Sequence, residues 1–190
     1  MVSALGATAC ASGHTSRTSV DVSGRIGSLR VDVSDRRAVV AFAGRPDAER
    51  RGRSPAASFG GLYDGLGYSC SRRAGRDTFA LVARGGPACH TVFFIDARSG
   101  RLGTFYTIDP RYRARGGVRV GMPTEKAERL LHRDVHVACV AAIFMKSRRA
   151  ALTVLFSGGV LHRDGTMSGG HVDALVLHGL RHDPGVFECM

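Results

Sequence analysis

The sequence lacks several features that would make a function easy to assign. No segment approaches the roughly 18 consecutive apolar residues that a membrane-spanning helix needs. No two cysteines have the C-x-x-C spacing of zinc ribbons and thioredoxin-like motifs. The most glycine-rich candidate for a phosphate-binding loop, 84–87, lacks the P-loop spacing and the helix that should follow it. The chain has only four glutamates, and its aspartates show no paired spacing, so nothing indicates acid–base catalysis.

Lysine is also scarce, although the chain is strongly basic. Its formal net charge is +11 and its pI is about 10.5, yet Lys126 and Lys146 are the only lysines. The arginines are scattered, with short pairs such as Arg148-Arg149 and no long run of like charge. This distribution favours solvated surface charge over a dedicated anion-binding face. Binding to nucleic acid or another polyanion remains the alternative.

What the chain does contain is an internal likeness. Residues 26–42 and 115–131 match at a constant offset of 89, which aligns Gly27 with Gly116 and Arg30 with Arg119. Each copy reads as a short extended run, a polar step that begins a helix, and a short helix. Internal similarity of this kind predicts two related units in one chain.

The predicted fold class is therefore α+β, with two tandem units that each pack a short helix on an antiparallel sheet. We expect a leader and linker over 1–24, a first unit over 25–109 and a second unit over 110–190. Ser34-Asp35 and Thr124 are the predicted helix N-caps, and 48–66 is predicted to be a loop. Short apolar runs separated by glycine-containing turns predict the strands.

The opening of the second unit, GVRVGMPTEKAERLL over 117–131, resembles the repeat of β-lactamase inhibitory proteins. Similar openings occur in small outer-membrane assembly lipoproteins and in many secreted actinobacterial proteins. In the first unit, Asp32 stands where the pattern has Gly121. The resemblance implies a module that binds another protein through a sheet or its edge loops. It transfers no inhibitor contact residue to this chain.

The N-terminus and the cysteines indicate export. Small residues precede Cys10, and a Ser/Thr/Gly-rich segment follows it, as at the end of a lipoprotein signal peptide. Cys10 is thus a candidate for lipidation. Four cysteines allow three pairings, of which Cys70–Cys89 with Cys139–Cys189 is the simplest. Such bridges persist in oxidising compartments.

Candidate contact residues are few. Arg111, Tyr112 and Arg113 lie in the connection between the predicted units, and Tyr and Arg are enriched where proteins bind partners. His132 and His136 have the i, i+4 spacing of metal ligands on a helix, but nothing completes a site. We predict no metal, cofactor or catalytic residue.

The sequence predicts a non-enzymatic binding protein, secreted or lipid-anchored, whose partner is a protein or a component of the cell envelope. A lipid anchor would be its contact with the membrane, and nucleic acid is not the favoured partner.

Overall fold

The computed structural model describes residues 18–53, 62–71, 79–80, 88–137 and 140–180. Within these ranges most residues with regular structure lie in strands, and two eight-residue α-helices are present. The helices are α1 (Arg36–Ala43) and α2 (Thr124–Leu131), and a 3₁₀ turn, η2 (Arg115–Gly117), precedes α2. No helix in the described part of the chain is both long and apolar enough to cross a bilayer.

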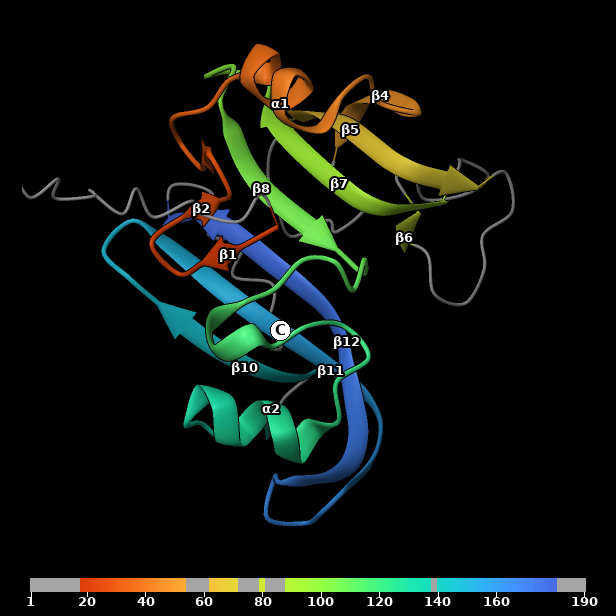
Figure 1. Cartoon of the computed structure of the whole chain (residues 1–190), viewed down its shortest axis with the longest axis vertical. Coiled ribbons are helices and arrows are strands. Elements are labelled where there is room, and N and C mark those ends of the chain that lie inside the picture. Colours follow the sequence, from red (N-terminus) through yellow and green to blue (C-terminus); the bar gives the residue numbers. More distant parts are fainter. Residues whose placement is uncertain (1–17, 54–61, 72–78, 81–87, 138–139, 181–190) are drawn as a thin grey trace, which may run out of the picture.

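The strands form two antiparallel sheets (Figure 1). The small sheet contains β1 (Val20–Asp21), β2 (Arg25–Ile26) and β3 (Leu29–Arg30). The first strands of the large sheet are β4 (Ala48–Arg53), β5 (Leu62–Ser71), β6 (Phe79–Ala80), β7 (Ala88–Asp96) and β8 (Leu102–Thr107). Its later strands are β9 (His136–Val137), β10 (Ala141–Lys146), β11 (Ala150–Leu161) and β12 (Met167–Gly179).

The large sheet runs without interruption through both halves of the chain. Its order is β4-β5-β7-β8-β12-β11-β10-β9, with β6 paired to β7. The junction is the antiparallel pair β8–β12, in which Leu177 lies opposite Phe105. The predicted boundary between residues 109 and 110 falls in the connection just after β8.

The predicted α+β fold class is therefore wrong, because the protein is mostly β and does not consist of two helix-on-sheet units. The helices are too short to form a layer, whereas β11 and β12 are long strands of 12 and 13 residues. Residues 48–53 also form β4, although they were predicted to lie in a loop. Their charged sequence lacks the apolar alternation that marks a half-buried strand.

The larger of two hydrophobic clusters in the described part of the chain connects most of the elements. It joins Val39 of α1 and Phe93 of β7 with Leu175 and Leu177 of β12, and it includes Ile26 of the small sheet. Figure 1 shows α1 at the end of the large sheet near β7 and β8, and α2 at the end near β10 to β12. Ring contact between Phe42 and Phe93, with centroids 6.4 Å apart, fixes α1 on β7. Because Ile26 lies in the same cluster as Phe93 and Leu177, the small sheet shares a core with the large one.

The helix starts differ from one another. The Asp35 carboxylate accepts a 2.8 Å hydrogen bond from the Ala38 amide, as expected for the predicted N-cap. Thr124 is not a cap: it is the first residue of α2, it is fully buried, and Pro123 occupies the cap position. At the aligned offset of 89, Gly27 and Gly116 both have positive φ, of 54° and 70°. The two aligned glycines thus share a left-handed φ, although Gly27 lies in the β2–β3 turn and Gly116 lies in η2.

Candidate functional site

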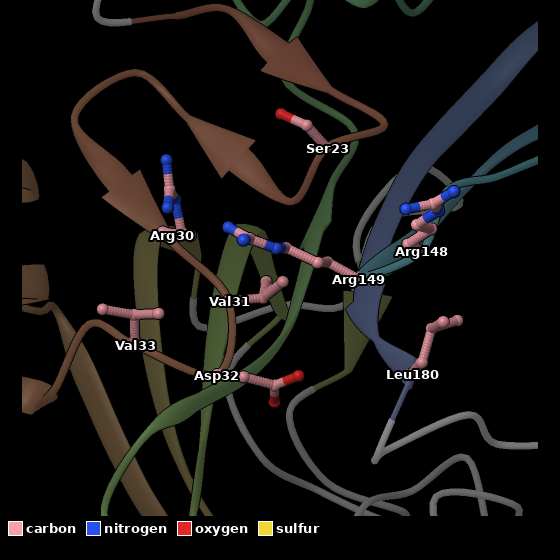
Figure 2. Close-up of a pocket in the computed structure, with 8 residues that line it drawn as sticks. All are labelled: Ser23, Arg30, Val31, Asp32, Val33, Arg148, Arg149 and Leu180. Carbon is pink, nitrogen blue, oxygen red and sulfur yellow. The ribbon is translucent and has the colours of Figure 1, made fainter.

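A cavity of about 340 Å³ lies where the small sheet meets one end of the large sheet (Figure 2). We call it the arginine pocket, and its lining residues are Ser23, Arg30, Val31, Asp32, Val33, Arg148, Arg149 and Leu180. They come from the β1–β2 turn, from β3 and the segment that follows it, from the β10–β11 turn and from the residue that follows β12. The pocket thus depends on long-range packing between both ends of the chain.

The first wall is the tight turn that joins β1 to β2. The Asp21 carboxylate accepts a 2.6 Å hydrogen bond from the amide of Ser23, which fixes the turn. Gly24 has a φ of 92°, and a Cβ there would meet Val31 and Ala150 at 2.8 and 3.2 Å. Glycine is therefore needed for close approach and for the left-handed backbone. This packing places Ser23 at the rim of the pocket.

The second wall is the segment that leads from β3 into α1. Asp32 has a φ of 61°, and its amide donates a 2.7 Å hydrogen bond to the carbonyl of Leu102. The amide of Leu102 donates in return to the carbonyl of Ser34, also at 2.7 Å. These bonds tie the segment to the start of β8. The carboxylate of Asp32 lies against Gly179, where any added Cβ would collide with it.

The third wall is the β10–β11 turn, which presents two successive arginines. The hydroxyl of Ser147 accepts 3.1 Å hydrogen bonds from the amides of Arg149 and Ala150. The carbonyl of Arg149 accepts a 3.2 Å bond from the amide of Leu180, which attaches the turn to the end of β12. The backbone beneath the Arg148 and Arg149 side chains is thus fixed from two sides.

The pocket is electropositive. Its lining carries three arginines and one aspartate, a net charge of +2. Arg30 is half-buried, while Arg148 and Arg149 are exposed. Within the described residues, ion pairs form at Arg36–Glu49, Arg51–Asp64 and Arg111–Asp109, and none involves a lining arginine. The lining offers hydrogen-bond donors from the three guanidinium groups and from the hydroxyl of Ser23.

The predicted contact residues Arg111, Tyr112 and Arg113 do not line this pocket. The guanidinium of Arg111 donates hydrogen bonds to the carboxylate of Asp109, with Nη2–Oδ2 at 2.6 Å and Nε–Oδ2 at 2.9 Å. Burial alone would raise the pKa of Asp109, but the hydrogen bonds and charge of Arg111 outweigh it and hold that pKa below its usual range. The pair fixes the connection that leaves β8.

Tyr112 faces inward and not toward solvent. Its ring packs on Phe105 with centroids 5.0 Å apart, and burial raises the pKa of its phenol to about 12. Arg113 extends the small sheet, since its carbonyl accepts a 2.8 Å hydrogen bond from Val20. Its side chain is exposed, as is that of Arg111. The role of these three residues in partner binding stays a prediction.

Among the predicted cysteine pairs, the disulfide Cys70–Cys89 is present and joins the neighbouring strands β5 and β7. Cys139 and Cys189 lie outside the described residues, as does the predicted lipidation site Cys10. His132 ends α2 in a left-handed conformation and His136 lies on β9, so the two do not share a helix face. No group of potential metal ligands occurs among the residues that the structure describes.

The lining arginines were not among the candidate residues of the sequence. In the sequence, Arg148-Arg149 is one of several scattered arginine pairs, and Arg30 belongs to the segment that aligns with 115–131. The available signal was local: Ser147, a residue type that favours turns, precedes the pair between two apolar runs. That pattern predicts two arginines on a hairpin turn, but not that Arg30 lies nearby.

No protein-family model matches the chain, and no curated protein matches it. Among solved structures, the chain is similar to the uncharacterized protein yfeY from Escherichia coli, with a TM-score of 0.49 and 16% identity. That similarity covers 85% of this chain and 99% of the other.

A second similarity is to an extracellular protein containing an SCP domain from Bacillus anthracis, with a TM-score of 0.38 and 12% identity. It covers 76% of this chain and 43% of that protein, so the chain spans less than half of it. Because both TM-scores lie below 0.5, neither neighbour assigns an activity, a ligand or a partner to this chain.

Proposed function

We propose that the chain is an exported, non-enzymatic binding protein of the cell envelope, either secreted or held by a lipid anchor at Cys10. The observation that carries the export part is the Cys70–Cys89 disulfide. Structural disulfides are rare in reducing compartments and common in exported proteins. Cys89 is fully buried and its partner half-buried, so the bridge is built into the sheet.

The binding part of the proposal is supported by the lining of the arginine pocket. Three guanidinium groups and a hydroxyl meet there, and they supply donors that can hold a ligand. The resemblance of 117–131 to β-lactamase inhibitory proteins would make the partner a protein. Under our proposal, an acidic group of a protein or envelope component enters the pocket.

Export is tested by alkylating thiols in the protein as it comes from its native cells, without reductant, and then by mass spectrometry. We expect Cys70 and Cys89 to stay unmodified until the sample is reduced. Five alkylated cysteines before reduction would contradict export.

Binding is tested by crosslinking the full chain to native envelopes and then repeating the interaction with the purified partner. We expect the wild-type chain and the matched surface variant Arg119→Ala to bind equally, and Arg148→Ala/Arg149→Ala to bind less. The polyanion-binding alternative would be favoured if Arg119→Ala lost as much partner binding as Arg148→Ala/Arg149→Ala. Binding should then also weaken steeply with added salt and with added DNA.

A further inference from the structure

The ligand class of the arginine pocket follows from its donors, and it deepens the proposed function by naming what that same site holds. We propose that the pocket binds the phosphate group of a small phosphate monoester. Each guanidinium carries five N–H donors in a planar fork that matches phosphate oxygens. None of the three lining arginines is paired with a carboxylate of the described residues, so these donors remain available.

The arrangement fits phosphate better than carboxylate. A carboxylate presents two oxygens in one plane, and a single arginine fork engages both of them. A phosphate presents oxygens in several directions and accepts donors from several sides. Figure 2 shows Arg149 extending across the cavity toward Arg30, with Arg148 on its other side and Ser23 at the rim. Arg149 lies between Arg148 and Arg30 in this view, so donors from two distant segments line the same cavity.

Charge and size agree with this ligand class. The net charge of +2 on the lining balances the two negative charges of a phosphate monoester. A cavity of about 340 Å³ is at the small end of the range for ligand pockets, about 300–1,000 Å³. It accommodates a phosphate with a short organic group.

The apolar part of the lining explains why an ester fits better than inorganic phosphate alone. Val31 forms part of the wall and is buried, while Val33 is 56% exposed at the edge. The side chain of Leu180 lies on the opposite side of the cavity from Val33 (Figure 2). Carbon atoms of an ester group would cover these side chains and remove apolar surface from water.

The test is calorimetric titration of the full oxidised chain with glycerol phosphate, inorganic phosphate and succinate. We expect glycerol phosphate to bind most tightly and succinate most weakly. Arg149→Ala and Arg30→Ala should each weaken glycerol phosphate binding by about tenfold or more. Arg149→Lys should lose part of that affinity, because lysine keeps the charge but not the fork.

The matched control is Arg119→Ala, which removes the exposed arginine aligned with Arg30 at the offset of 89. It should bind glycerol phosphate as the wild type does, and the unfolding midpoints of all variants should agree within a few degrees. The proposal is overturned if glycerol phosphate does not bind, if succinate binds as well, or if Arg119→Ala loses as much affinity as Arg149→Ala.

The source of the phosphate is distinguished by a second arm with lipid vesicles. Binding to phosphatidic acid vesicles but not to phosphatidylcholine vesicles, lost in Arg149→Ala, would identify a lipid headgroup. Binding to glycerol phosphate alone would identify a soluble ester. If the envelope partner binds and no phosphate compound does, this inference fails while the proposed function stands. If the chain binds phosphate compounds but all five of its cysteines are free in its native cells, the phosphate inference stands and the proposed export fails.

Discussion

At the scale of single residues, three non-glycine residues of the described part of the chain have a left-handed backbone conformation. Asp32, Ser69 and His132 have positive φ values of 61°, 54° and 53°. Such conformations cost a residue with a Cβ roughly 1–2 kcal/mol. At Asp32 the bend turns the chain from β3 toward α1 and forms a wall of the arginine pocket. At His132 the same conformation ends α2.

His132 provides a prediction about stability. His132→Gly should raise the free energy of unfolding by about 0.5–1 kcal/mol, because glycine adopts the left-handed cap without strain but has more freedom in the unfolded chain. Urea denaturation measures the change. His136→Gly is the matched control, since His136 is also exposed but lies on β9. It should lower stability, and the prediction fails if both variants lower it.

The Asp109–Arg111 pair provides a prediction about pH. Because the pKa of Asp109 in the folded protein lies below its ordinary value of 3.8, ionised Asp109 stabilises the fold fully above that value. The contribution is lost as the pH falls through the lower, folded-state pKa. Asp109→Asn should therefore cost about 1 kcal/mol at neutral pH, and the difference from wild type should close below about pH 4.

The stability difference between wild type and Asp109→Asn is measured by thermal unfolding at a series of pH values from neutral to acidic. Circular dichroism follows the unfolding. Asp134→Asn removes one exposed negative charge and controls for the change in net charge. A gap between wild type and Asp109→Asn that stays constant down to low pH would show that the ion pair does not stabilise the fold.

At the scale of elements, the β11–β12 hairpin extends beyond the strands that flank it. β10 pairs with β11 only over 151–156, and β8 pairs with β12 only over 175–178. The outer part of the hairpin carries the exposed side chains of Val160 and Leu161. It is held to α2, because the Glu125 carboxylate accepts a 2.8 Å hydrogen bond from the amide of Gly169.

Glu125 is therefore predicted to hold the outer hairpin against α2. Hydrogen bonds from its own amide and from that of Gly169 hold the pKa of Glu125 below its ordinary value of 4.5. In Glu125→Ala, the amide of Gly169 should exchange with deuterium faster than in the wild type, as measured by NMR. Lys126→Ala, at the next exposed residue of α2, should leave that exchange rate unchanged. Unchanged exchange in Glu125→Ala would mean that other contacts hold the hairpin.

The elements also show which parts of the fold follow from local sequence. The predicted strand near 90–96, the strand near 102–108 and the helix after Asp35 are confirmed, because a short apolar run bounded by glycine-containing turns marks each strand and an N-cap marks the helix. β4 was missed because Arg50 and Arg51 occupy a sheet edge, where charge replaces apolar alternation.

At the scale of the whole molecule, long-range pairing decides both the fold and the site. The pairing of β8 with β12 brings together strands about 70 residues apart, and no local pattern encodes it. The arginine pocket has the same origin, since Arg30 and Arg149 approach each other only after the small sheet packs on the large one. Sequence reasoning could identify the Cys70–Cys89 pair and the turn arginines, but not their spatial context.

The continuous sheet leads to a prediction that also tests the proposed boundary between residues 109 and 110. Leu177 of β12 is fully buried, lies opposite Phe105 of β8 and belongs to the core cluster that contains Phe93 of β7. If the two halves unfold as one unit, Leu177→Ala should lower the opening free energy of amides in β7 and in β12 equally, by about 3 kcal/mol. Native-state hydrogen exchange measures both sets of amides in one sample. Phe144→Ala is the control, because that side chain is 39% exposed on β10 and should change either set much less. If Leu177→Ala weakens β12 and leaves the protection of Phe93 unchanged, the halves are separate folding units despite their shared sheet.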